Sequence, residues 1–299
     1  MMRFPLSAPI ARGGPIRLPN ILRRVFGQSE TPVFSNDKTV APTSGVPHRA
    51  HIALVGAGPG AKDLLTLRAV ERIQQADVVF YDRLVGQDVI ALARKDAECV
   101  FVGKHVGAHA WPQDRINAVI VSEALKGRRV VRLKSGDPGI FGRAGEELAA
   151  ARAEGIPVEI VPGVTSASAA AASLGQSLTE RGIADTLILT TGMSREGDPL
   201  PQSARFAGPG TTTALYMSVR QSARISAALL ARGLPQDAPV HIVVDASKRT
   251  ERRYTATAAT FADTLASKRI IGCAMILVTW PSANSGNVTS AAEPAAALA

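Results

Sequence analysis

The chain has 299 residues, enough for two modest domains or one large one. Its 46% hydrophobic and 20% charged residues are ordinary for a soluble globular protein, and no run approaches the roughly 18 consecutive apolar residues that a membrane-spanning helix needs. The two cysteines, Cys99 and Cys273, lie in apolar segments without a CxxC pair. We therefore expect two buried thiols in strands, no disulfide or thiolate metal site, and a cytoplasmic setting.

The positive charge is spread unevenly along the chain. Residues 1–50 carry seven Lys or Arg and two Asp or Glu, +5 of the net +9, and are rich in Pro, Gly and Ser. We interpret them as a disordered basic leader with a short helical stretch at 18–26, and residues 281–299 as a flexible tail. The remaining body, with 27 basic and 22 acidic residues, does not demand nucleic acid and suits a polyanionic small substrate.

Apolar runs alternate with helical spacings from residue 51 onward. Thr66 stands where it can cap the first helix. This alternation predicts a mostly parallel α/β sheet in an amino-terminal domain, residues 51–164. The expected strands are 52–55, 77–81, 99–102, 130–133 and 158–161, and the expected helices are 66–75, 88–94, 113–125 and 145–153.

A Pro-Gly-Val sequence at 162–164 separates a second set of elements. These elements predict a carboxyl-terminal α/β domain, residues 165–280. Because its last strands follow one another with short connections, we expect a mixed sheet. The expected strands are 186–190, 212–216, 240–244, 252–256 and 274–278, and the expected helices are 165–174, 221–231 and 260–266.

A glycine-rich turn, GAGPG at 56–60, follows the first strand. It is not the dinucleotide-binding fingerprint, because Ala61 stands where the third glycine belongs and Pro59 lacks an N–H for a phosphate. We interpret it as a turn where the backbone meets a ligand closely. The alternative is a turn that binds nothing.

A second loop, Ser135-Gly136-Asp137, follows the strand expected at 130–133. Loops at the carboxyl ends of parallel strands are where α/β folds bind ligands. Gly136 allows close backbone approach, and Asp137 supplies a carboxylate. The alternative is a loop that only caps the following helix.

Seven short segments occur in register over about residues 51–280. They are VGAGPG at 55–60, DLLTL at 63–67, YDRLV at 81–85, VGK at 102–104, LKSGDPGIFGRAGEE at 133–147, VPGVT at 161–165 and YM at 216–217. Together they resemble the uroporphyrinogen-III C-methyltransferases of the tetrapyrrole methylase family. The resemblance implies two α/β domains of the tetrapyrrole methylase type, a cleft between them that binds S-adenosylmethionine (SAM), and a homodimer.

The resemblance also implies roles for single residues. Asp82 is the implied proton acceptor and Lys104 the implied proton donor. Arg83, Lys134 and Arg143 are expected to bind substrate carboxylates, with a solvated surface role as the alternative for each. The implied SAM contacts are Pro59, Ser135, Gly136, Asp137, Ile140, Thr165, Ser166, Met217 and Ala246.

Five positions depart from the family pattern. Ser135 stands where glycine is usual, and Gly139 where a bulky apolar residue is common, which suggests a compensating exchange. Glu180 replaces a common histidine and puts a negative charge where a polyanionic substrate is expected to approach. Met193 and Ser218 also stand where other residues are common.

The sequence therefore predicts a SAM-dependent methyltransferase that converts uroporphyrinogen III to precorrin-2 by methylation at C2 and C7, for siroheme or cobalamin synthesis. Residues 1–50 are too short for the dehydrogenase–ferrochelatase domain of some relatives, so we expect methylation only. Alternatives are another corrin-ring methylase, a SAM- or tetrapyrrole-binding protein without turnover, and a nucleic-acid partner of the leader. We expect no metal site, since His105 and His109 have no third ligand, and neither a membrane nor a nucleic-acid partner.

Overall fold

The computed structural model describes residues 51–103, 111–192 and 206–283. The strands in these ranges form two five-stranded sheets, and both sheets belong to one compact unit of the chain. The predicted leader, Lys104, the His105–His109 pair and nearly all of the predicted tail lie outside the described residues. No helix in the described ranges is long and apolar enough to cross a membrane.

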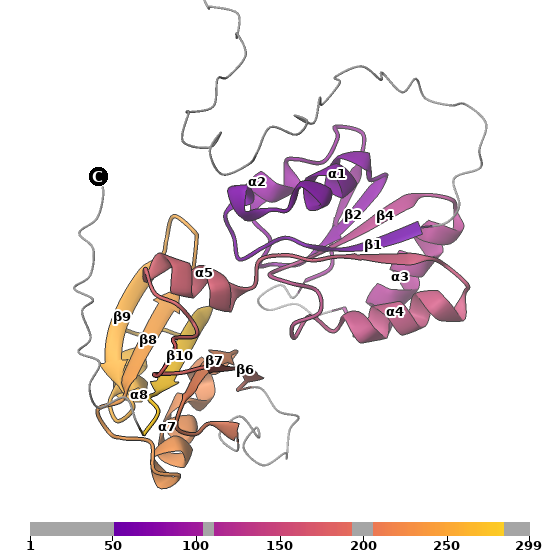
Figure 1. Ribbon diagram of the computed structural model, residues 1–299. Helices are drawn as coiled ribbons and strands as arrows, with labels where there is room; N and C mark the ends of the chain where they lie inside the picture. The colour runs from indigo at the N-terminus through magenta and orange to yellow at the C-terminus, as the bar shows by residue number, and fades with distance from the viewer. Residues whose placement is uncertain (1–50, 104–110, 193–205, 284–299) are drawn as a thin grey trace, which may run out of the picture. The chain divides into compact units, whose positions relative to one another are not determined.

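The first sheet is entirely parallel, with the strand order β3-β2-β4-β1-β5, as the alternating sequence pattern predicts. Helices α1 and α2 cover one face and α3 and α4 the other (Figure 1). The strands are β1 (His51–Gly56), β2 (Val78–Tyr81), β3 (Glu98–Phe101), β4 (Arg129–Lys134) and β5 (Val158–Val161). The helices are α1 (Leu67–Gln75), α2 (Gln87–Ile90), α3 (Gln113–Leu125) and α4 (Ala144–Ala153), with the short 3₁₀ helix η2 (Lys62–Leu64) before α1.

Both faces of this sheet are buried, as its central parallel strands require. Along β1, Ala53 and Val55 pack with α1 and α2, whereas Ile52 and Leu54 pack with α3 and α4. Thr66 caps α1 as predicted, because its hydroxyl accepts a hydrogen bond from the Ala69 N–H at 3.2 Å. A continuous apolar strand therefore signals two covering layers of helix.

Helix α2 is shorter than the sequence pattern predicts. It ends at Ile90, and the chain continues in tight turns in which the Leu92 N–H donates to the Val89 carbonyl and the Ala93 N–H to the Ile90 carbonyl. These bonds span three residues instead of four, which is typical of a helix end that has tightened into 3₁₀ geometry.

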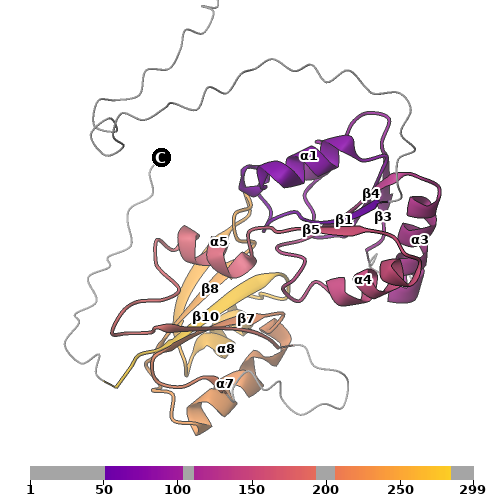
Figure 2. The ribbon, with the colours of Figure 1, turned by 45° about the vertical axis from the view of Figure 1, so that its right-hand side comes forward.

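The second sheet is mixed, as predicted. Its order is β6-β7-β10-β8-β9, in which β6 and β7 are parallel and every other pair is antiparallel. Helix α5 covers one face, and α7 and α8 cover the other (Figure 2). The strands are β6 (Thr186–Thr191), β7 (Thr211–Tyr216), β8 (Pro239–Val244), β9 (Arg252–Thr257) and β10 (Ala274–Trp280). The helices are α5 (Ser166–Ser173), η3 (Val219–Gln221), α7 (Ser222–Ala231) and α8 (Phe261–Ser267).

Three glycines bring the loops after β1, β4 and β5 together. A Cβ added to Gly56 would lie 2.6 Å from the Gly163 nitrogen and 2.8 Å from the Gly136 oxygen. Gly136 also exchanges backbone hydrogen bonds with Gly58 across the same contact, at 2.7 and 3.3 Å. Glycine is therefore required at 56 and 163 by close approach of backbone to backbone, and only Pro59 of the glycine-rich turn lines a cleft.

The prediction of two buried cysteines is wrong. Cys99 and Cys273 are both exposed. Cys99 lies on β3, an edge strand of the first sheet, and Cys273 directly precedes β10. An apolar sequence context indicates a strand, but it does not say whether a neighbouring layer covers each face of that strand.

We expect Gly163→Ala to lower the free energy of unfolding by about 2 kcal/mol, because its Cβ would lie 2.9 Å from the Gly56 Cα and backbone cannot move aside cheaply. Gly145→Ala in α4 is the matched control, since a Cβ there meets no atom within 4 Å. Urea unfolding measures both. Equal stabilities of the two variants would contradict the glycine contact.

Candidate functional site

A cleft of about 580 Å³ lies at the loops that follow the strands of both sheets. This volume falls within the range of small-molecule sites, roughly 300–1,000 Å³. From the first sheet and the segment after it, its lining comprises Pro59, Arg83, Leu84, Ser135 and Ser166. From the second sheet, it comprises Gly192, Tyr216, Met217, Val219, Arg220, Gln221, Val243, Asp245, Ala246, Lys248 and residues 271–275.

Several residues beside this cleft have left-handed backbone. The φ angles of Met217 and Asp245 are 52°, and that of Ser247 is 66°. This conformation is costly for residues other than glycine, and such residues cluster at functional sites. The Ser247 hydroxyl also accepts a hydrogen bond from the Ala61 N–H at 3.1 Å, which ties the loop after β8 to the glycine-rich turn.

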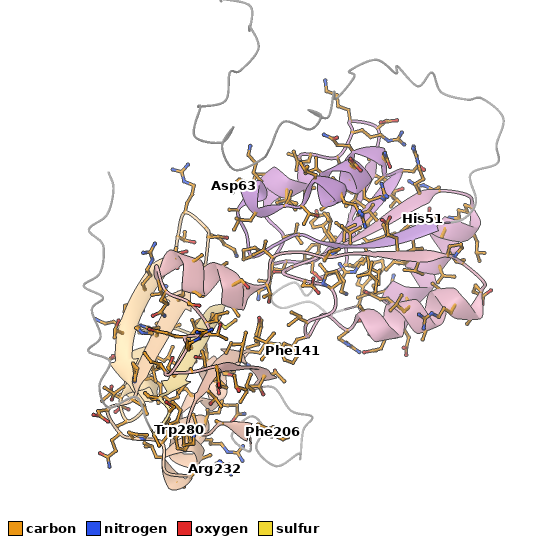
Figure 3. All side chains as sticks on the ribbon, in the orientation of Figure 1. His51, Asp63, Phe141, Phe206, Arg232 and Trp280 are labelled. Carbon is orange, nitrogen blue, oxygen red and sulfur yellow. The ribbon has the colours of Figure 1, made fainter. Side chains whose placement is uncertain are left out.

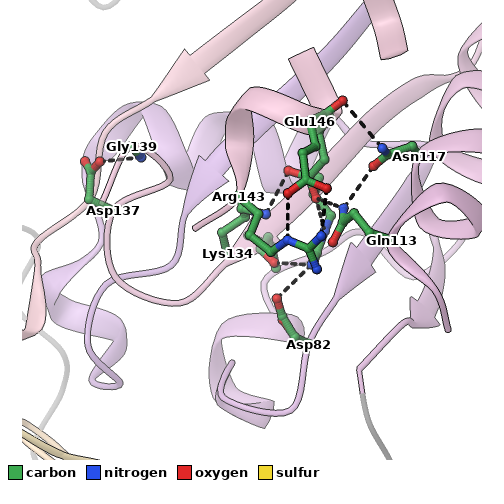
Figure 4. Close-up of polar contacts among 11 residues, drawn as sticks. Asp82, Gln113, Asn117, Lys134, Asp137, Gly139, Arg143 and Glu146 are labelled. Atoms are coloured by element: carbon green, nitrogen blue, oxygen red, sulfur yellow. Dashed lines mark hydrogen bonds and ion pairs between the residues drawn. The ribbon is translucent and has the colours of Figure 1, made fainter. Parts of the chain in front are cut away.

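The Asp137 carboxylate holds the loop after β4 in shape. One of its oxygens accepts a hydrogen bond from the Gly139 N–H at 2.7 Å (Figure 4), and the other accepts one from the Gly163 N–H at 3.0 Å. Both oxygens are thus engaged by backbone, and Asp137 does not line the cleft. The residue joins the loops after β4 and β5.

Tyr216 connects the second sheet to the loops of the first. Its hydroxyl lies 2.5 Å from the Thr165 hydroxyl, and its ring centroid lies 5.0 Å from that of Phe141, which Figure 3 labels. Burial raises the pKa of Tyr216, so the phenol is neutral and acts as a hydrogen-bonding wall of the cleft. The sequence pattern did not single out the Tyr216 side chain.

The structure brings together five of the nine residues that the resemblance assigns to SAM. Pro59, Ser135, Ser166, Met217 and Ala246 line the cleft. The other four lie in the same loops but do not line it. They are Gly136, Asp137, Ile140 and Thr165.

Two residues expected to bind substrate are engaged in ion pairs. Lys134 is buried, with its Nζ 2.7 Å from Glu147, and Arg143 is exposed, with its Nη2 2.7 Å from Glu146 (Figure 4). Burial and the charge of Arg132 lower the pKa of Lys134, and Glu147 opposes that shift. Lys134 therefore faces the protein interior and does not line the cleft.

Two arginines that line the cleft differ from Lys134 and Arg143 in their surroundings. Arg83 and Arg220 are exposed, and neither has an ion pair or hydrogen bond with any residue in the described ranges. Sequence reasoning anticipated Arg83 but missed Arg220. In the sequence, Arg220 could have been found from its position three residues after Met217, which the resemblance assigns to SAM.

Four positions that depart from the family pattern lie in the described ranges. Ser135 lines the cleft, whereas Gly139 is exposed and a Cβ there would lie 3.1 Å from the Asp137 Oδ1. Glu180 pairs with the Ala184 backbone and does not line the cleft. Ser218 is buried, and its hydroxyl donates to the Tyr216 carbonyl at 2.8 Å. Met193 lies outside the described residues.

No group of three or more His, Cys, Asp or Glu side chains in the described ranges could hold a metal ion. His241, expected to be structural, lies on β8, and burial lowers its pKa.

The two five-stranded sheets and the cleft beside their loops place the chain in a class of two-sheet α/β proteins whose solved structures include methyltransferases. A solved cobalt-precorrin-4 methyltransferase matches with a TM-score of 0.70 and 31% identity, covering 80% of this chain and 98% of that one. The uroporphyrin-III C-methyltransferase of Thermus thermophilus, solved with S-adenosyl homocysteine (SAH), matches with a TM-score of 0.65 and 36% identity. The match covers 76% of this chain and 96% of that one.

The sequence pattern of the tetrapyrrole (corrin/porphyrin) methylases matches residues 51–262, and the chain belongs to this family. Siroheme synthases are also similar. That of Enterobacter sp. (strain 638) is 47% identical over 210 residues, which are 70% of this chain and 46% of the relative. The siroheme synthase of Escherichia coli O139:H28 is 48% identical over 205 residues, which are 69% of this chain and 45% of the relative. The chain thus spans about half the length of these curated relatives.

We expect Asp137→Ala to lower the free energy of unfolding by about 1–3 kcal/mol, because the Gly139 and Gly163 N–H groups lose their acceptor. The loosened loop should also bind SAH about tenfold more weakly. Ser135→Gly, two residues away, is the control and should change both quantities little. Urea unfolding and calorimetry measure them, and an SAH affinity of Asp137→Ala equal to that of the parent would refute this role.

Proposed function

We propose that this chain transfers methyl groups from SAM to uroporphyrinogen III at C2 and C7, giving precorrin-2. The observation that carries the proposal is the cleft, where Pro59, Ser135, Ser166, Met217 and Ala246 meet although they are far apart in the sequence. The similarity to a uroporphyrin-III C-methyltransferase and to siroheme synthases supports the choice of substrate.

The cleft has the character that a bound SAM needs. SAM, when bound, supplies an activated methyl group. Apolar side chains such as Met217, Ala246 and Val243 line the cleft, and the left-handed turns at Met217 and Asp245 redirect the backbone there. These residues would hold the donor in one orientation, and such positioning supplies much of the rate of a transfer reaction.

We assign the proton acceptor of the reaction to Asp82. The side chain follows the carboxyl end of β2 and directly precedes Arg83, which lines the cleft. A carboxylate at this edge can take the proton that the methylated ring must lose. We keep Lys104 as the proposed proton donor on the strength of the resemblance, and it lies outside the described residues.

Arg83 and Arg220 are the proposed partners of the substrate carboxylates. They come from different sheets, and their guanidinium groups have no ion pair in the described part of the chain. Guanidinium groups bind carboxylates with two parallel hydrogen bonds, which fixes the orientation of the ligand as well as its affinity. Arg143, already paired with Glu146, would have to exchange one carboxylate for another.

We make three further proposals. The chain forms a homodimer, as the resemblance implies. It acts in the cytoplasm, as its cysteine content indicates, and its domains divide at residues 164 and 165, after the Pro-Gly-Val sequence. Light scattering of the purified protein tests the first of these.

In the decisive assay, purified protein receives SAM and enzymatically made uroporphyrinogen III, and the product masses are recorded. We expect two added methyl groups per tetrapyrrole, because the proposed product carries one at C2 and one at C7. SAH binding measured by calorimetry is the control for an intact cleft. Binding of SAH without any methyl addition would reject the proposal in favour of a binding protein without turnover.

We expect Arg220→Gln to raise the KM for uroporphyrinogen III about tenfold, because the cleft loses one charge-assisted partner for a carboxylate. The SAH dissociation constant should stay within about twofold of the parent value. Arg224→Gln on α7 is the matched control, since Arg224 is exposed and does not line the cleft. Equal KM values for the two variants would remove Arg220 from the substrate site.

A further inference from the structure

Four charged side chains form a network beside the cleft, which we call the buried quartet: Asp82, Arg132, Lys134 and Glu147. Arg132 and Lys134 are two residues apart on β4, and Glu147 comes from α4. The side chains of Arg132 and Lys134 are each 5% exposed and that of Glu147 is 1% exposed, whereas that of Asp82 is 32% exposed. Asp82 is therefore the member of the quartet that solvent reaches.

Arg132 uses all three of its side-chain nitrogens. Its Nη2 donates to the Asp82 Oδ2 at 2.8 Å, its Nε to the Glu147 Oε1 at 3.2 Å, and its Nη1 to the Leu133 carbonyl at 2.8 Å. The second Glu147 oxygen accepts from the Lys134 Nζ at 2.7 Å. Glu147 and the Leu133 carbonyl thus anchor the guanidinium group that holds Asp82. Figure 4 labels Asp82 and Lys134.

The Asp82 Oδ1 differs from the other three carboxylate oxygens of the quartet, which all accept hydrogen bonds. It is buried and has no hydrogen-bond partner in the described part of the chain. The quartet is otherwise balanced, with two positive and two negative groups, which is what makes burial of charge tolerable. A network that served stability alone would satisfy its last acceptor, since unpaired buried acceptors are rare.

The opposite end of β2 supplies an internal comparison. Asp77 precedes this strand and is held by Arg129, also on β4, through both carboxylate oxygens. Arg94 adds a further ion pair. The Arg129 guanidinium holds the pKa of Asp77 at about 2. The same pair of strands therefore carries two Asp–Arg pairs, and an oxygen is left unpaired only in the pair beside Arg83 of the cleft.

We propose that Arg132 is a positioning residue for Asp82, and that Glu147 acts through Arg132. The inference rests on the proposed function. Arg132 holds the Asp82 carboxylate through the Oδ2 and leaves the Oδ1 without a partner, so the carboxylate keeps one orientation and the capacity to take a proton. In the transfer, a bond forms between the methyl carbon and a ring carbon, the bond from the methyl carbon to the donor sulfur breaks with its electron pair staying on sulfur, and the ring gains the positive charge of the donor. A bond to hydrogen on the ring then breaks, its electron pair stays in the ring and cancels that charge, and the proton binds the Asp82 carboxylate.

Arg132→Lys tests the proposal, because lysine keeps the positive charge but cannot bridge Asp82 and Glu147 with a planar fork. We expect kcat to fall at least tenfold, while the KM for uroporphyrinogen III and the SAH dissociation constant change less than twofold. Arg129→Lys is the matched control. It makes the same exchange on the same strand, against Asp77, and should leave kcat unchanged.

A kcat of Arg132→Lys equal to that of the parent would overturn the proposal. So would a parallel loss of kcat, SAH affinity and thermal midpoint, which would indicate a structural role. A crystal structure of Arg132→Lys with SAH gives a second readout, in which we expect the Asp82 carboxylate to leave its position; an unmoved carboxylate would overturn the proposal. If the unsubstituted chain methylates nothing, the proposed function fails, and the crystal structure still decides whether Arg132 holds Asp82.

Discussion

The approach of three backbone segments at Gly56, Gly136 and Gly163 is the constraint on which the site depends. Gly56 ends β1, Gly136 lies in the loop after β4, and Gly163 follows β5. Because no side chain separates them, Asp137 can reach across to the Gly163 N–H, and the chain can pass from the first sheet into α5. The cleft residues Pro59, Ser135 and Ser166 lie within three residues of these glycines in the sequence.

Most of the fold could be predicted from the sequence, because local patterns and tertiary packing agree. The helix expected at 113–125 and the strand expected at 158–161 have the bounds of α3 and β5. The spacing of apolar residues and the positions of turn residues predict where these elements begin and end. The short connections between the strands of residues 252–278 indicate the mixed second sheet. Motifs in register located the loops that line the cleft, since those loops are defined by Gly, Pro and Asp at fixed positions.

The partners of individual side chains could not be predicted. Lys134 is a basic residue in a motif loop, which indicates a ligand contact, but α4 places Glu147 against it. The exposure of Cys99 depends on its place in β3, an edge strand, and the cleft position of Arg220 depends on how η3 follows β7. Each outcome is set by elements that are distant in the sequence, so a local pattern does not contain it.

The place of β10 in the second sheet has a consequence for biosynthesis. This strand is the last element of the described chain, yet it lies between β7 and β8 and pairs with both. During translation the first sheet can assemble once β5 has left the ribosome, whereas β7 and β8 must wait without their common neighbour until residue 280 is made. Residues 271–275 also line the cleft, so a nascent chain completes the walls of the cleft only after residue 275 has been made.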